Sequence, residues 1–162
     1  MNVQSATFKD GGAIPQSMVF KGMGCEGDDT SPQLSWSGAP AETKGYGIVM
    51  HDPDAPTSGG FYHWVMFNIP GDTTELAAGA GGGKLQAMLH GETLGHTDMG
   101  ANAYAGPCPP PGPAHRYVLT LYALDCAKLP LDASTTGAKL EFMMKEHTLA
   151  KASITGMYAR SQ

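Results

Sequence analysis

Basic residues and long apolar runs are both scarce in this sequence. Its 162 residues contain 10 lysines and arginines against 15 aspartates and glutamates, which gives a formal net charge of −5. Nucleic-acid binding needs a basic stripe, so we expect no nucleic-acid partner. No segment approaches the roughly 18 consecutive apolar residues of a membrane span, so we expect no membrane insertion.

The chain also lacks an export pattern and has few cysteines, and both absences bear on its compartment. Residues 1–5 show no basic segment followed by an apolar one, which predicts a cytoplasmic protein, or a periplasmic one if an export signal has been removed. Cys25, Cys108 and Cys126 are odd in number and have no metal-type spacing, which argues against a disulfide framework or a zinc knuckle. We therefore expect reduced thiols. A Cys25–Cys108 bridge stays open, because the sequence does not fix their separation.

The 22 glycines and 12 prolines fall between short apolar runs. This composition predicts one loop-rich globular domain over residues 1–162. The runs typical of strands are 34–36, 46–50, 63–69 and 116–124. In the run at 116–124 both alternating sets of side chains are partly apolar, so we expect a central strand there.

A helical period shows only near the C-terminus. Its stripe consists of Leu140, Met143, Met144, His147 and Lys151. Residues 134–136 offer caps for this helix, and residues 153–159 predict a last strand. The glycine-rich run at 79–83 lacks the flanking strand and helix of a dinucleotide loop, so we interpret it as a flexible connection.

Polar side chains gather where the predicted strands begin or end. Two carboxylates follow the strand at 46–50 in the sequence Asp52-Pro53-Asp54-Ala55-Pro56, whose prolines stiffen the backbone. His63 begins one strand and His115 precedes another. If these strand ends share one edge, these four side chains line one pocket, with Tyr104 and Tyr117 as walls. Structural roles stay open for each: turn caps for the aspartates and packing for the histidines.

A stiff loop leads into His115. It has the sequence Gly106-Pro107-Cys108-Pro109-Pro110-Pro111-Gly112-Pro113, in which five prolines fix φ and remove backbone donors. Such rigidity suits the rim of a binding site. Simple punctuation between two strands is the alternative.

Together, these motifs resemble the signatures of the phosphatidylethanolamine-binding protein family, in particular its bacterial Raf-kinase-inhibitor-like branch. The matching segments are Thr30-Ser31-Pro32-Gln33-Leu34-Ser35-Trp36, Asp52-Pro53-Asp54-Ala55-Pro56, the strand from His63 to Asn68, Gly106-Pro107-Cys108-Pro109-Pro110 and His115-Arg116-Tyr117. The resemblance implies antiparallel β-sheets packed as a sandwich, with one or two peripheral helices near the C-terminus. It also implies a cis peptide bond at Ala55-Pro56.

The resemblance further implies a small anion pocket at one edge of the sheet. The positions that match it are Asp52, Asp54, His63, Pro109, His115 and Tyr117, with Gly106 and Pro107 on the rim and Tyr104 nearby. Met99 stands where the family has an aromatic residue, and the longer C-terminal helix of the mammalian proteins is missing, which leaves phospholipid selectivity open. A kinase or protease partner is implied by the resemblance alone, and no cofactor or metal is implied.

The chemistry expected of this pocket is binding of a phosphoryl or carboxylate group. An imidazole beside a carboxylate holds its proton more readily, and its N–H groups donate to anion oxygens. We expect Asp52 to orient a histidine and Asp54 to brace the loop, whereas strand alternation turns Arg116 away into a structural ion pair. The alternative is a hydrolase or metal-dependent enzyme that uses His63, His115 and Asp52. No serine or cysteine lies in a nucleophile elbow, so we favour a non-enzymatic regulatory module.

Overall fold

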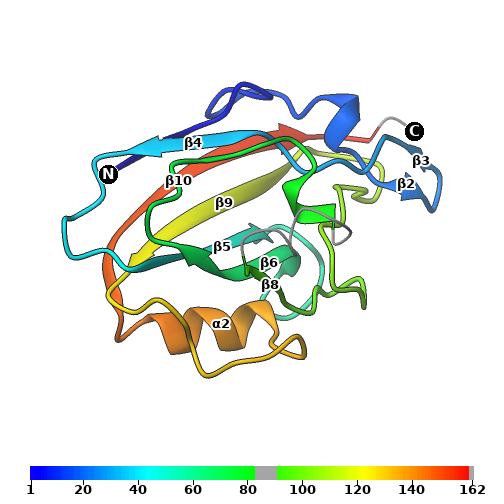
Figure 1. Cartoon of the computed structure of the whole chain (residues 1–162). Coiled ribbons are helices and arrows are strands. Elements are labelled where there is room, and N and C mark those ends of the chain that lie inside the picture. The colour runs from blue at the N-terminus through cyan, green and yellow to red at the C-terminus, as the bar shows by residue number, and fades with distance from the viewer. Residues whose placement is uncertain (83–90, 161–162) are drawn as a thin grey trace.

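Five antiparallel strands form the main sheet of the computed structural model, which describes residues 1–82 and 91–160 (Figure 1). Their order in space is β10-β9-β5-β6-β8. The bounds are Gly45–Asp52 for β5, Phe61–Pro70 for β6, Thr93–Leu94 for β8, His115–Leu124 for β9 and Thr148–Tyr158 for β10. Strand β9 pairs with β5 on one side and β10 on the other, so its expected interior position is confirmed.

A smaller sheet and a helix cover opposite faces of the main sheet (Figure 1). The smaller sheet has the order β1-β4-β7. Its strands are β1 (Asn2–Gln4), β4 (Leu34–Ser37) and β7 (Glu75–Leu76), and the helix is α2 (Gly137–Met144). The remaining elements are the hairpin of β2 (Lys21–Gly22) and β3 (Cys25–Glu26) and the 3₁₀ turns η1 (Gln16–Met18) and η2 (Ala80–Gly82). The expected mostly-β sandwich with a helix near the C-terminus is confirmed.

The alternation of side chains along each central strand supplies both apolar layers. On β6, Trp64 and Met66 join the cluster between the two sheets, while Val65 joins the cluster beneath the helix. On β9, the side chains that face the smaller sheet are Tyr117, Leu119, Leu121 and Ala123. Successive strand residues point to opposite faces, so these strands must be apolar on both sides. This arrangement holds the strand ends, and whatever side chains they carry, in fixed positions.

Helix α2 is shorter than the sequence pattern predicts. Leu140 and Met144 are fully buried, and the Thr136 side chain caps the helix by accepting from the Lys139 amide at 3.3 Å, as expected. The predicted stripe continued to His147 and Lys151, and this extension is wrong. Lys151 lies in β10, where ladder pairing with β9 outweighs the local helical period.

The glycine-rich run is packed, contrary to the expected flexible connection. Ala80 and Gly81 are buried in η2. The Gly81 amide donates to Ser31 Oγ at 2.8 Å, and the Gly81 carbonyl accepts from the Tyr104 amide at 2.7 Å. Gly83, the last residue of the run, lies outside the described residues. Within residues 1–82 and 91–160, no helix has the length and apolarity needed to cross a membrane.

Candidate ligand-binding site

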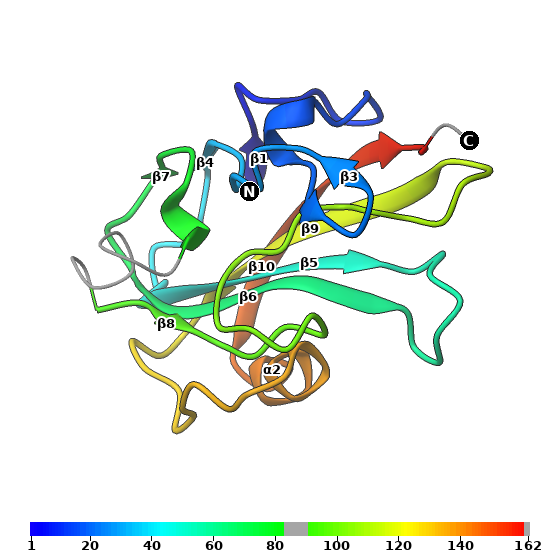
Figure 2. The same cartoon turned by 90° about the vertical axis from the view of Figure 1, so that its right-hand side faces the viewer.

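A cavity of about 270 Å³ lies at the end of the main sheet where β5 stops and β9 starts. Figure 2 shows that the loop after β5, the loop before β9 and the β2–β3 hairpin all lie toward this end. The lining residues are Phe20, Met23, Asp52, Ala55, Pro56, Thr57, Phe61, His63, Met99, Gly106, Cys108, Pro109, Pro110, His115 and Tyr117. The cavity is therefore largely apolar with a few polar groups, the usual composition of a small-molecule site.

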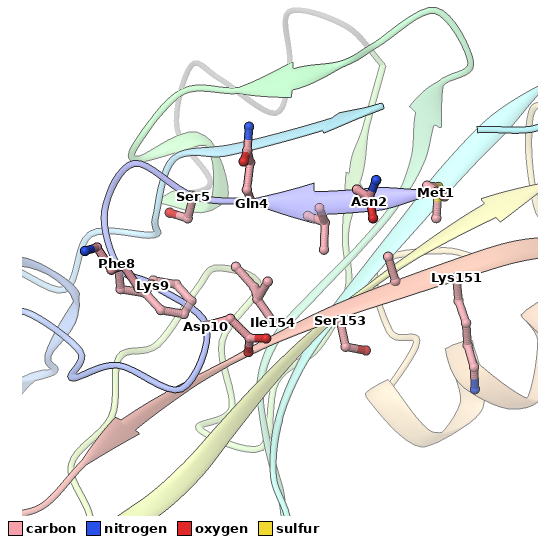
Figure 3. Close-up of a pocket in the computed structure, with 12 residues that line it drawn as sticks. Met1, Asn2, Gln4, Ser5, Phe8, Lys9, Asp10, Lys151, Ser153 and Ile154 are labelled. Carbon is pink, nitrogen blue, oxygen red and sulfur yellow. The ribbon is translucent and has the colours of Figure 1, made fainter. Parts of the chain in front are cut away.

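A larger hollow, of about 520 Å³, lies between β1 and β10 (Figure 3). Its charged side chains do not converge on a common point. The Asp10 carboxylate accepts from the Thr155 amide at 2.8 Å, and Lys151 points away from β1 (Figure 3). The convergent polar chemistry is at the smaller cavity.

Asp52 is the buried polar centre of the cavity. It is only 2% exposed and ends β5. Its Oδ1 accepts from the Asp54 amide at 2.8 Å, and its Oδ2 accepts from Nδ1 of His115 at 2.7 Å. The predicted role of Asp52 in orienting a histidine is confirmed. Because Nδ1 of His115 is engaged, Nε2 is the ring nitrogen left for a ligand.

Asp54 does not line the cavity. Its Oδ1 lies 2.9 Å from Nη2 of Arg116, and its Oδ2 accepts from the Arg116 amide at 2.9 Å. The side-chain and backbone hydrogen bonds from Arg116 lower the pKa of Asp54 to about 2. Arg116 thus forms the structural ion pair that strand alternation predicts. Its partner is Asp54, which braces the loop from outside the cavity.

His63 is buried and held by one backbone contact. Its Nδ1 lies 2.8 Å from the Ala105 carbonyl, an acceptor that requires Nδ1 to carry the proton. Burial lowers the pKa of His63, outweighing the Ala105 hydrogen bond and the Asp52 charge. The expectation that an imidazole beside these carboxylates holds its proton more readily is therefore wrong for His63. Its neutral ring offers Nε2 as a hydrogen-bond acceptor.

Tyr117 lies between the two histidines. Its ring centroid is 5.3 Å from that of His63, edge-on, and 6.4 Å from that of His115, stacked. Burial, followed by the Asp52 charge, raises the pKa of Tyr117, so its hydroxyl stays protonated. The three rings and Asp52 form one contiguous polar floor under the apolar walls.

The rim is fastened to the N-terminal part of the chain. The Gly106 amide donates to Asp29 Oδ1 at 2.6 Å, and the Pro107 carbonyl accepts from the Phe20 amide at 3.0 Å. Cys25 and Cys108 form a disulfide, which corrects the expectation of reduced thiols; Cys126 is the free cysteine. The packing of the proline loop against the β2–β3 hairpin brings the two sulfurs together, which the sequence spacing alone does not reveal.

Three further expectations for the site are corrected by the structure. Tyr104 is not a wall: it packs edge-on against Trp64, and its hydroxyl donates to the Met18 carbonyl at 2.8 Å. Pro107 is not among the residues that line the cavity, and its carbonyl accepts from the Phe20 amide instead. The Ala55-Pro56 bond is trans, like every peptide bond of the described residues.

Sequence reasoning missed most of the apolar walls. Phe61 shares a strand face with His63, 4.9 Å between ring centroids, and the alternation of β6 could have revealed it. Phe20 and Met23 come from the distant β2–β3 hairpin, for which the sequence gives no signal. Arg160 was also missed: its Nη1 lies 3.8 Å from Cys108 Sγ, which places a guanidinium beside the rim.

The proposed histidine–carboxylate metal set is not assembled. Within residues 1–82 and 91–160, the group whose ligand atoms lie mutually close enough for an ion is Asp125, Cys126 and His147, at the other end of β9. The cavity residues Asp52, His63 and His115 form no such group.

The fold and these motifs have a clear counterpart among known proteins. A family model described as phosphatidylethanolamine-binding protein matches residues 4–159. The chain belongs to the phosphatidylethanolamine-binding protein family. Its resemblance to bacterial members is also confirmed by full-length relatives.

Two relatives within this family come from Escherichia coli. YbhB is 43% identical over 159 residues, which cover 98% of this chain and 100% of YbhB. YbcL is 40% identical over 157 residues, or 96% of this chain and 86% of YbcL.

Two solved structures share the fold. The crystal structure of Escherichia coli YbcL, described as a new member of the mammalian PEBP family, matches with a TM-score of 0.92 and 40% identity over 99% of this chain and 98% of that one. The homolog CT736 of Chlamydia trachomatis matches with a TM-score of 0.82 and 30% identity, over 99% and 97% of the two chains.

Proposed function

We propose that this family member is a non-enzymatic binding module for a small phosphoryl or carboxylate group that carries a short apolar substituent. The observation that carries the proposal is the hydrogen bond between Asp52 and His115. It fixes the imidazole and leaves Nε2 at the cavity as the contact for an anion oxygen. In the imidazolium form, Nε2 donates to an anion oxygen, and such an oriented donor in a largely apolar cavity is a strong anion contact.

The other polar groups suit a ligand that carries its own proton. Neutral His63 accepts a hydrogen bond at Nε2, whereas the protonated Tyr117 hydroxyl is hydrogen-bonded to Asp52. A phosphomonoester, whose second pKa is near 6, carries a hydroxyl in part of its population at neutral pH. Among residues 1–82 and 91–160, the lining contains the Asp52 carboxylate and no lysine or arginine, which disfavours a fully charged dianion. Arg160 beside the rim attracts the anion from outside.

The apolar walls would receive the rest of the ligand. Phe20, Met23, Phe61 and Met99 surround the polar floor. They fit a short organic group better than bare water or a free inorganic ion. We therefore expect a phosphomonoester with a short alkyl group, such as ethyl phosphate, to bind more tightly than inorganic phosphate or acetate.

The enzymatic alternative has less support. Cys108 is used in a disulfide, and the Thr57 hydroxyl donates to the Gly60 carbonyl at 2.7 Å. Neither is adjacent to a general base in the manner of an activated nucleophile. A regulatory role toward a kinase or protease stays a proposal from family membership. The disulfide favours an oxidising compartment, and so the periplasmic alternative over the cytoplasmic one.

The test is a titration with ethyl phosphate, phosphoethanolamine, inorganic phosphate and acetate, monitored through the imidazole NMR resonances. We expect saturable shifts of His63 and His115, in the affinity order given above, and loss of binding in His115→Gln. The matched control is His147→Gln, at the opposite end of β9, which should bind as the wild type does. Resonances of His63 and His115 that do not move, or binding retained in His115→Gln, would contradict the proposed site.

A further inference from the structure

We propose that Asp125, Cys126 and His147 form a binding site for a divalent cation of the zinc class. Each residue offers one ligand atom, and the three atoms lie within 4.8 Å of one another. This cluster is separate from the cavity. His115 begins β9 and Asp125 follows its last residue, Leu124, so the two ends lie on the order of 30 Å apart at 3.3 Å per strand residue.

The backbone at this cluster is fixed by the sheet. Asp125 and Cys126 come directly after β9, and His147 comes directly before β10. The Asp125 amide donates to the His147 carbonyl at 2.9 Å, and Thr148 pairs with Leu124 in the adjoining ladder. Pairing of the two strands therefore brings the three ligand residues together, although 20 intervening positions separate Cys126 from His147 in the chain. The positions of the three ligand residues are therefore set by strand pairing and not by the conformation of the segment between them.

The donor set selects the cation. A thiolate and an imidazole favour zinc and its borderline-soft neighbours, whereas calcium and magnesium prefer oxygen ligands alone. Three protein ligands leave a fourth tetrahedral position for water. The side chains of His147 and Asp125 are 37% and 47% exposed, so an ion can enter and exchange from solvent.

The carboxylate and the imidazole need little adjustment to share an ion. Nδ1 of His147 lies 2.8 Å from Oδ1 of Asp125, held by a shared proton. Two ligands bound tetrahedrally at about 2.0 Å from zinc are about 3.3 Å apart, so the ion would replace this hydrogen bond with a small outward shift. On binding, the Cys126 thiol releases its proton to solvent and the imidazole proton moves from Nδ1 to Nε2. The released proton balances the charge of the bound thiolate.

The thiol is available because the other two cysteines are paired. Cys25 and Cys108 form the disulfide, which leaves Cys126 as the free cysteine, half-buried. A metal signal that contains thiolate ligation must therefore come from Cys126. This makes the site testable with a spectroscopic probe that reports on sulfur directly.

The experiment is a titration of the purified protein with Co²⁺, which takes zinc sites and gives a sulfur-to-cobalt charge-transfer band in the near ultraviolet. We expect one equivalent to produce the band and tetrahedral visible absorption, and one equivalent of Zn²⁺ to remove both. Cys126→Ser should lose the charge-transfer band, and His147→Gln should weaken or abolish binding. Circular dichroism of each variant checks that the fold is kept.

The matched controls are Glu146→Gln, an acidic neighbour outside the cluster, and His115→Gln in the cavity. Both should keep the full band. Absence of the band in the wild type would overturn the proposal, as would a band that persists in Cys126→Ser. A band lost in His115→Gln but kept in His147→Gln would also overturn it. None of these outcomes bears on anion binding, so the two proposals fail or stand separately.

Discussion

Asp52 Oδ2 and His115 Nδ1 lie 2.7 Å apart although 63 residues separate them in the chain. Antiparallel pairing of β5 and β9 explains the contact, because it brings the end of one strand beside the beginning of the other. Asp52 is 2% exposed, so its carboxylate needs partners, and its carboxylate oxygens accept from the Asp54 amide and the His115 ring. The fold thus requires the pair for its own stability while leaving Nε2 of His115 for a ligand.

Asp52→Asn should weaken phosphate binding. The amide keeps the shape of the side chain but removes the charge that strengthens the hydrogen bond to His115. Hydrogen bonds to charged groups contribute about 1.5–3 kcal/mol, so we expect roughly a 10- to 100-fold loss of affinity. Isothermal titration with phosphoethanolamine measures it. If affinity instead rises, the carboxylate repels the ligand more than it orients the imidazole, and the orienting role is refuted.

His63 should stay neutral at a pH where exposed histidines are protonated. Burial lowers its pKa, so between that value and the unfolded value near 6.5 the unfolded chain binds more protons than the folded one. The stability contribution of neutral His63 is therefore present at neutral pH and is lost as pH falls below about 6.5. Imidazole NMR shifts from pH 8 to about 5 should show His63 titrating below its unfolded value near 6.5. A His63 that titrates at or above about 6.5 would contradict this.

The sequence predicts the strands of the main sheet better than the contents of the cavity. Alternation along 116–124 and 63–69 is a local signal, and the structure has long buried strands at both places. The polar residues at strand ends are also visible, because they interrupt apolar runs. What the sequence does not show is which strand ends become neighbours, since that depends on pairing between distant segments.

The failures have the same origin. Tyr104 and the cysteines were misjudged because their partners, Trp64 and each other, come from remote parts of the fold. The extension of the helical stripe to His147 and Lys151 is wrong because the residues from Thr148 onward pair with β9. Local periodicity carries no information about that pairing. Once a strand is identified, alternation along it predicts the side-chain directions from the sequence alone. It correctly places Arg116 on the face opposite His115.

Gly106→Ala should damage the rim. A Cβ at Gly106 would lie 2.1 Å from the Met18 carbonyl oxygen and 2.6 Å from the Phe20 amide nitrogen, and backbone atoms cannot turn aside. Overpacking of this kind costs about 1–3 kcal/mol or more. The denaturant concentration at the midpoint of unfolding and the affinity for phosphoethanolamine should both decrease. Gly82→Ala is the matched control, because a Cβ there meets nothing within 4 Å; equal effects of the two substitutions would refute the steric argument.

Loss of the disulfide should weaken both the fold and the site. Cys25 and Cys108 are 83 positions apart, so their bridge constrains a long loop of the unfolded chain. Removal of a native disulfide typically costs about 2–5 kcal/mol. Cys25→Ser should lower the free energy of unfolding by that amount. It should also reduce ligand affinity, because Cys108 lines the cavity. Cys126→Ser, measured with a chelator present, should change neither the stability nor the ligand affinity. If Cys25→Ser is as stable as Cys126→Ser, the stabilising role of the bridge is refuted.

The ion pair between Asp54 and Arg116 should contribute to stability except in strong acid. Arg116 lowers the pKa of Asp54 to about 2, so the folded state holds this proton less tightly than the unfolded chain does. Stability from the pair is therefore fully present above the unfolded value near 3.9 and is lost as pH falls through about 2. The wild type should melt at a higher temperature than Arg116→Gln at about pH 6, and this difference should shrink toward zero at roughly pH 2. Exposure of both side chains makes the effect small and sensitive to salt. Lys128→Gln, at an exposed position, is the control for loss of one positive charge; an identical pH profile for the two variants would assign the effect to net charge instead of the pair.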